Sequence, residues 1–108
     1  ITPAERAAVG ARLGWPTGRP VVGFVGALGD RRKGFDTLFA AWSDLCRDPR
    51  WDADLAVVGT GAELPEWRAR AVADGLAERV WFLGFRTDVP ALLAGLDAVA
   101  HPARYEPL

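Results

Sequence analysis

The segment GALGDRRKG, residues 26–34, gathers glycines and basic side chains in a way that suits an anion. It holds the only lysine of the chain, Lys33, among thirteen basic residues that are otherwise arginines. Glycine lets a backbone approach a ligand closely, and a helix beginning after Gly34 would add N-terminal amides and a favourable dipole. The segment therefore predicts a phosphate site, and the alternative is a solvated charged loop.

Two familiar phosphate-binding motifs do not fit the chain. A Walker A loop needs a lysine after its last glycine and then a hydroxyl residue, but Lys33 precedes its glycine and no hydroxyl follows. The segment GTGAEL, residues 59–64, comes closer to the dinucleotide pattern G-x-G-x-x-G, but Leu64 replaces the third glycine. Trp81 stands about 20 residues further on, where a nicotinamide site would carry an acid. A dinucleotide site is therefore not predicted.

The remaining chemically active residues are few. His101, Cys46 and the carboxylates lack the spacing of metal ligands, so neither a metal nor a cofactor is expected. Cys46 lies in an apolar-periodic stretch and is expected to be buried and unreactive, and a single cysteine suits a reducing compartment such as the cytoplasm. His101 is expected to make a structural hydrogen bond. Glu106 is either an exposed acid or an acceptor for sugar hydroxyls.

These residues need a scaffold, and hydrophobic periodicity predicts one. Strands are expected at 21–26, 54–59, 79–84 and 97–102, and helices at 2–13, 35–46, 64–75 and 87–95, the last capped by Asp88. Strands that alternate with helices predict an α/β fold with a Rossmann-like parallel sheet, which binds ligands at the carboxyl ends of its strands. The residues expected on the inward helix faces are Phe35, Leu38, Phe39, Trp42, Leu45, Cys46, Leu64, Trp67, Ala71 and Val72.

Size and charge limit the function. The 108 residues suit one small domain or part of a larger one, and half of them are hydrophobic. A formal net charge of −1 provides no general attraction for nucleic acid or an anionic membrane, so no nucleic-acid partner is expected. No apolar run approaches the length of a membrane span.

Four segments together resemble one protein family. They are VGALGDRRKGFDTLFAAW, LAVVGTGAEL, RVWFLGFRTDVPALLAGLDA and VAHPARYEP, in that order. In content, order and spacing they resemble the C-terminal, donor-binding domain of the GT-B glycosyltransferases, specifically the retaining group 1 or family-four type. The resemblance covers nearly the whole chain from about Arg12, and it implies the same Rossmann-like fold, as half of a GT-B enzyme.

The resemblance also implies roles for individual residues. Lys33 would contact the donor diphosphate beside Gly26, with Arg32 rather than Arg31 replacing the arginine that the family usually has at the position of Ala27. The residues implied at the nucleotide are Gly59 and Gly61 in a glycine turn, and Phe85 and Arg86 in a loop whose backbone meets the base. Glu106 matches the first glutamate of an E-x7-E signature near the donor sugar, and no catalytic set is complete in the chain.

The implied protein is larger than the chain. Residues 1–108 would be a partial nucleotide-sugar binding domain led by a helix within 1–15, without the N-terminal acceptor-binding domain and inactive alone. The parent would be a hexosyltransferase-type enzyme that acts on a nucleotide-diphosphate sugar and an acceptor sugar or lipid, in the cytoplasm or peripherally at the inner membrane face. Two alternatives are a non-catalytic regulatory or nucleotide-binding module and a GT-B-like nucleotide-sugar epimerase. Arg19 lies on the turn before the first strand, at the opposite end of the sheet, and its substitution by alanine is expected to leave donor binding nearly unchanged.

Overall fold

Parallel strands form the centre of the molecule, which we describe from a computed structural model covering residues 3–13, 19–29, 34–90 and 95–100. Within these residues the strands are β1 (Val21–Val25), β2 (Asp54–Val58), β3 (Val80–Gly84) and β4 (Ala98–Val99). They lie in the order β3-β2-β1-β4, and every neighbouring pair is parallel. The predicted α/β fold with a Rossmann-like parallel sheet is therefore confirmed.

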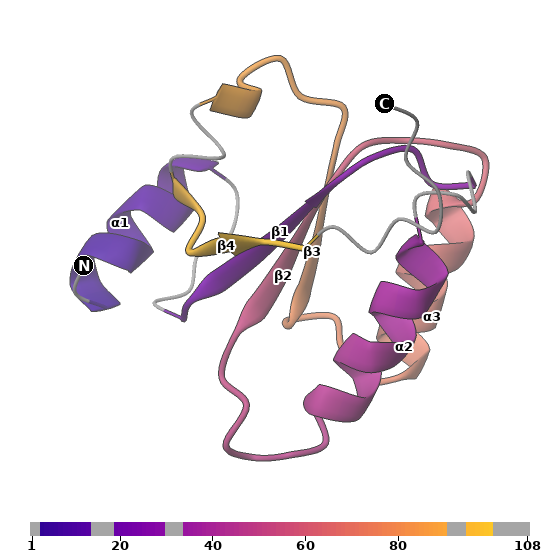
Figure 1. Cartoon of the computed structure of the whole chain (residues 1–108), viewed down its shortest axis with the longest axis horizontal. Coiled ribbons are helices and arrows are strands. Elements are labelled where there is room, and N and C mark those ends of the chain that lie inside the picture. The colour runs from indigo at the N-terminus through magenta and orange to yellow at the C-terminus, as the bar shows by residue number, and fades with distance from the viewer. Residues whose placement is uncertain (1–2, 14–18, 30–33, 91–94, 101–108) are drawn as a thin grey trace.

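Helices cover the sheet on both sides. They are α1 (Pro3–Leu13), α2 (Phe35–Leu45) and α3 (Leu64–Ala73). Figure 1 shows α2 and α3 together on one side of the sheet and α1 on the other. Residues 89–90 and 95 are also helical, within the predicted helix at 87–95. Each boundary lies within about two residues of its prediction, as expected where helix ends fray.

The main core lies between the sheet and the α2–α3 layer. Phe24, Leu55 and Val57 point from the sheet toward Phe35 and Phe39 of α2, and all five are at most 3% exposed. Because α2 places an apolar residue inward at every third or fourth position, its first two turns are fixed against the strands. The end of α2 that carries the predicted anion segment is thus the best-buried part of the helix.

Two residues expected to face inward do not. Val72 is 67% exposed because its neighbour Ala71, which is 2% exposed, occupies the inward position on α3. Successive helical residues are turned by about 100°, so both cannot face the sheet. Leu45 is 39% exposed because it is the last residue of α2.

Strand β4 pairs with β1, so β1 has a neighbouring strand on each side. Its flanking backbone continues the pairing, since Asp97 N–H donates to the Val21 carbonyl (2.9 Å) and Ala100 N–H donates to the Gly23 carbonyl (2.8 Å). The Asp97 carboxylate also accepts from Val21 N–H at 2.8 Å. The strand predicted at 97–102 is shorter within the described chain, and positions 101–102 lie outside it.

Candidate functional site

The loops that follow β1 and β2 are joined along their backbones at the carboxyl end of the sheet. Gly26 N–H donates to the Val58 carbonyl and Leu28 N–H donates to the Thr60 carbonyl, each at 3.0 Å. Gly59 N–H donates to the Gly84 carbonyl at 2.8 Å, which ties the second loop to the end of β3. These bonds extend the parallel ladder beyond the strands, so the loops have little backbone freedom.

Gly59 and Gly61 are glycines because the first loop lies directly against them. A Cβ on Gly59 would lie 1.9 Å from the carbonyl oxygen of Gly26, and a Cβ on Gly61 would lie 1.7 Å from that of Leu28. Gly59 also has a φ of 140°, which L side chains rarely adopt. Close approach between two loops therefore accounts for both glycines, and their contact with a nucleotide stays a prediction.

Helix α2 begins at this same edge of the sheet. Its N-cap residue, Gly34, is buried in a left-handed conformation (φ 75°, ψ 20°) and has no side chain to cap the helix. Leu28 and Phe35 belong to the same core and are 1% and 3% exposed. The chain is therefore anchored at Leu28, within the predicted anion segment of residues 26–34, and again at Phe35, just after it. The positive end of the α2 dipole faces this loop edge, the carboxyl end of the sheet with the loops after β1 and β2.

Several predicted site residues lie outside the described chain. They are Arg31, Arg32 and Lys33 in the first loop, and His101 and Glu106 after β4. The structure describes the predicted residues Gly26, Gly59, Gly61, Phe85 and Arg86, and it brings the three glycines together at one edge of the sheet. Ala27, which stands where the family usually has an arginine, is exposed beside Gly26.

The loop after β3 carries a close ion pair that the sequence analysis missed. Arg86 donates from Nε and Nη2 to the two carboxylate oxygens of Asp88, at 2.9 and 2.6 Å. Hydrogen bonding from Arg86 lowers the pKa of Asp88, and the same bonds raise the pKa of Arg86. The described helical residues begin at 89, directly after Asp88, and the predicted cap stays a prediction because residues 91–94 of that helix lie outside the described chain. Phe85 is 76% exposed, so the loop presents its backbone and one aromatic ring.

A second pair was also missed, at the start of α3. Glu63 Oε1 accepts from the indole Nε1 of Trp67 at 3.2 Å. The carboxylate reaches toward the first loop, since a Cβ on Gly29 would lie 3.9 Å from Glu63 Oε2. The spacing of four residues on a predicted helix was the signal that could have found the pair.

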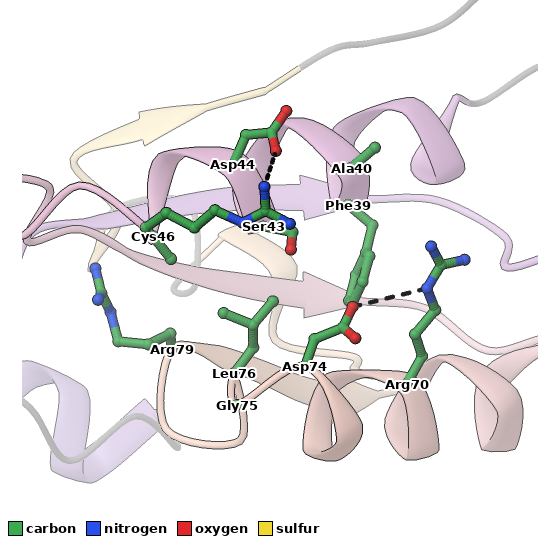
Figure 2. A pocket seen from close by; sticks show the side chains of 11 residues that line it. Phe39, Ala40, Ser43, Asp44, Cys46, Arg70, Asp74, Gly75, Leu76 and Arg79 are labelled. Atoms are coloured by element: carbon green, nitrogen blue, oxygen red, sulfur yellow. Dashed lines mark ion pairs between the residues drawn. The ribbon is translucent and has the colours of Figure 1, made fainter.

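The opposite end of the sheet has a different character. Figure 2 shows a pocket of about 530 Å³ between α2 and the turn that follows α3. Asp44 pairs with Arg47 at 3.4 Å and Arg70 pairs with Asp74 at 3.8 Å, so the charges along its wall largely neutralise one another. Burial raises the pKa of Cys46, which also lines the pocket. Arg79, the third arginine that lines the pocket, is paired with Asp54, so each of these arginines already faces a carboxylate.

A buried carboxylate organises that end. Asp54 is fully buried at the start of β2 and accepts from Arg19 Nη1 at 3.1 Å, Arg79 Nε at 3.3 Å and Trp81 Nε1 at 3.0 Å. Arg19 does lie at the end of the sheet away from the predicted site. The expectation that Arg19→Ala leaves donor binding nearly unchanged stays a prediction, and the ion pair with Asp54 adds a contribution of Arg19 to stability.

The described residues contain neither a grouped set of metal-ligating side chains nor a helix suited to span a membrane. No three His, Cys, Asp or Glu side chains among them are grouped as metal ligands would be. In the same residues, no helix has the length and apolar character to cross a membrane.

Comparison with known proteins identifies the family. The model of the family described as "Glycosyl transferases group 1" matches residues 19–108. The chain belongs to this family. The match includes all the loops described above.

Individual glycosyltransferases of the family agree with this assignment. The chain is 37% identical to the 2-deoxystreptamine N-acetyl-D-glucosaminyltransferase of Streptomyces fradiae over 89% of its length, and 36% identical to the lipopolysaccharide core mannosyltransferase LpsB of Rhizobium meliloti over 81%. These matches span only 23% and 26% of the two relatives. The chain thus corresponds to about a quarter of each.

A solved structure supports the fold. The crystal structure of Anabaena HepE in complex with UDP matches the whole chain with a TM-score of 0.74 and 31% identity, over 30% of that protein. HepE has also been solved with UDP-glucose, and that structure matches 95% of the chain with a TM-score of 0.70.

Proposed function

We propose that the chain forms the donor-binding part of a retaining glycosyltransferase that moves a sugar from a nucleotide diphosphate to an acceptor hydroxyl. The observation that carries the proposal is the loop edge, where hydrogen-bonded glycine loops meet the N-terminus of α2. The basic segment of the first loop joins the two, since it connects Gly29 to Gly34. The complexes of HepE with UDP and UDP-glucose support a donor of this class.

The proposed chemistry follows from where negative charge develops. The bond from the anomeric carbon to the diphosphate breaks, a bond to the acceptor oxygen forms, and the acceptor hydroxyl proton passes to the departing diphosphate. Negative charge grows on the leaving diphosphate, where Lys33, Arg32 and the α2 dipole would stabilise it. Because these groups can supply the positive charge, we expect no metal and no other cofactor to be required.

The other loops complete the proposed donor site. The turn of Gly59 and Gly61 would border the nucleotide, and the backbone at Phe85 and Arg86 would meet the base. Pairing with Asp88 already engages the Arg86 guanidinium, which suits a role for the backbone here. Glu106 would accept hydrogen bonds from the donor sugar. The relatives are named for different sugars, so we propose the class of donor and not its sugar.

Residues 1–108 are not proposed to bind the acceptor. Because the chain corresponds to about a quarter of its relatives, we place acceptor binding elsewhere in the parent and expect the chain alone to bind donor without transferring sugar. Transfer needs both substrates held in one geometry. We propose that the acceptor of the parent protein is a lipid or a sugar. We also propose that the parent lies in the cytoplasm, with peripheral attachment to the inner membrane face.

Lys33→Ala tests the proposed function. Calorimetric titration with UDP in the presence of EDTA should give an affinity about 10- to 100-fold weaker than that of the unmodified chain, since a charge-assisted hydrogen bond contributes roughly 1.5–3 kcal/mol. Lys33→Arg should recover only part of the affinity, because a planar guanidinium needs more room than an ammonium group.

Arg47→Ala is the matched control for charge. Arg47 is also basic, but it lies at the opposite end of the sheet and its side chain is 78% exposed. Its removal should leave UDP binding unchanged. Equal affinities for the unmodified chain and Lys33→Ala, or a binding step that EDTA abolishes, would contradict the proposal.

A further inference from the structure

Glu63 and Trp67 connect the two elements that would hold a diphosphate. Glu63 is half-buried at the start of α3, and its carboxylate accepts from the Trp67 indole while lying beside Gly29 of the first loop. The hydrogen bond restricts rotation of the indole ring about its side-chain torsions. One end of the pair thus reaches the edge of the anion segment.

The indole ring makes the second connection, to α2. Its centroid lies 5.1 Å from that of Phe35 with the planes at 85°, and 5.0 Å from that of Phe39. Phe35 is the first residue of α2 and is 3% exposed. A ring in edge-to-face contact with this residue fixes the position of the first helical turn.

The first turn of α2 depends on such packing because its cap provides no side chain. Gly34 makes no side-chain hydrogen bond to the helix, so aromatic contacts of Phe35 set the direction of the first turn. Besides Trp67, the rings outside α2 that contact Phe35 are Phe24 at 5.2 Å and Phe82 at 6.2 Å between centroids, and Phe39 of α2 itself lies at 6.1 Å. The effect of a helix dipole on an anion falls off within the first turn, so a small displacement changes it.

We propose that Glu63 and Trp67 are positioning residues for the donor diphosphate. Glu63 holds the indole ring, and the ring holds the N-terminus of α2 toward the terminal phosphate. Neither side chain touches the donor. The inference rests on the proposed function and adds two residues to it.

The test compares UDP with UMP, which lacks the terminal phosphate. In Trp67→Phe and in Glu63→Leu the ratio of UDP affinity to UMP affinity should fall by about two- to fivefold, the range expected for a helix dipole acting on an anion. In Glu63→Gln the ratio should not fall, because the amide oxygen still accepts from the indole and the lost negative charge can only have opposed the terminal phosphate.

Trp51→Phe is the matched control. Trp51 packs against Trp42 at 5.4 Å between centroids, and its indole nitrogen has no hydrogen-bond partner among the described residues. This variant loses the same atoms away from the loop edge, so it should leave the affinity ratio unchanged.

The outcomes separate this inference from the proposed function. An unmodified chain that does not prefer UDP to UMP overturns both. A chain that prefers UDP, with the same ratio in folded Trp67→Phe and Glu63→Leu, overturns the positioning role alone. Melting temperatures report folding, and Glu63→Leu provides the measurement if Trp67→Phe does not fold. A purely structural role would lower melting temperature and leave the ratio intact.

Discussion

The two ends of the sheet are held together by different kinds of interaction. At the carboxyl end, backbone hydrogen bonds join the loops after β1, β2 and β3, and glycines permit their close contact. At the amino end, side-chain charges dominate, with Asp54 bound by two arginines and a tryptophan. The carboxyl end depends on glycines, which have no side-chain atoms to separate the loops. The amino end depends on charged side chains that bind one another.

This difference indicates which end can accept a charged ligand. At the amino end the arginines that line the pocket already face carboxylates, which weakens their attraction for a further anion. At the carboxyl end, hydrogen bonds from the backbone N–H groups of Gly26, Leu28 and Gly59 fix the described parts of the loops, and the helix dipole is directed at the same edge. A rigid backbone frame with charge supplied beside it is a better anion site than a neutralised cluster of charges.

The largest expected effect belongs to the carboxyl end. Gly59→Ala should lower the free energy of unfolding by about 3 kcal/mol or more, because its Cβ would overlap a backbone oxygen and its φ suits glycine. UDP binding should fall with it, since relief of the overlap requires the first loop to move. Urea unfolding and calorimetric titration measure the two effects.

Gly75→Ala isolates the contribution of conformation. Gly75 also has a positive φ, 75°, but a Cβ there would meet nothing within 4 Å. The change should cost about 1–2 kcal/mol and leave UDP affinity intact. A Gly59→Ala protein that matched Gly75→Ala in both measurements would remove the packing argument for the loop edge.

A smaller effect is expected at the amino end. Asp54→Asn should lower the free energy of unfolding by about 2 kcal/mol, because Arg79 would keep a partly buried charge without its carboxylate. Arg19→Ala should cost less than about 1 kcal/mol, since that side chain is 41% exposed. Folded Asp54→Asn protein should bind UDP normally.

Asp52→Asn is the control for this substitution. Asp52 is exposed two positions before Asp54, and the change should alter the free energy of unfolding by no more than about 0.5 kcal/mol. A loss of UDP binding in folded Asp54→Asn, with stability unaffected, would mean that the two ends are not functionally distinct.

The smallest effect concerns Cys46 in the amino-end pocket. Burial raises its pKa above the ordinary value of about 9, so at pH 8 the thiol should be less ionised than in the unfolded chain. Alkylation by iodoacetamide should therefore be slower in the folded chain and should still accelerate above pH 9. Equal rates in folded and urea-unfolded chains at pH 8 would indicate an open, unperturbed thiol.

Local patterns predicted the elements well because they report which residues a single helix or strand buries. The period of α2 correctly placed Phe35, Phe39 and Trp42 inward, and the alternation of elements predicted the parallel sheet. The same reasoning failed at Val72, where a small alanine beside it takes the inward position. A pattern of apolar residues does not say which of two neighbours the helix will turn inward.

The contacts between residues far apart in the chain could not be predicted from local sequence patterns. Position 59 requires glycine because a side chain there would meet the carbonyl oxygen of Gly26, 33 positions earlier in the chain. The partners of Asp54 likewise come from before β1 and from the start of β3. Such contacts depend on how strands pair, and the pairing order is a property of the whole sheet.

The order of the strands has one further consequence. The chain moves outward from β1 to β2 and β3, and then crosses to the other side of β1 to form β4. β1 is therefore a topological switch point, at which successive connections leave the sheet in opposite directions and open a crevice between them. The chain leaves β1 at Gly26 and reaches the end of β4 at Ala100 on the neighbouring strand, so two positions more than 70 residues apart in sequence lie at the same edge of the sheet.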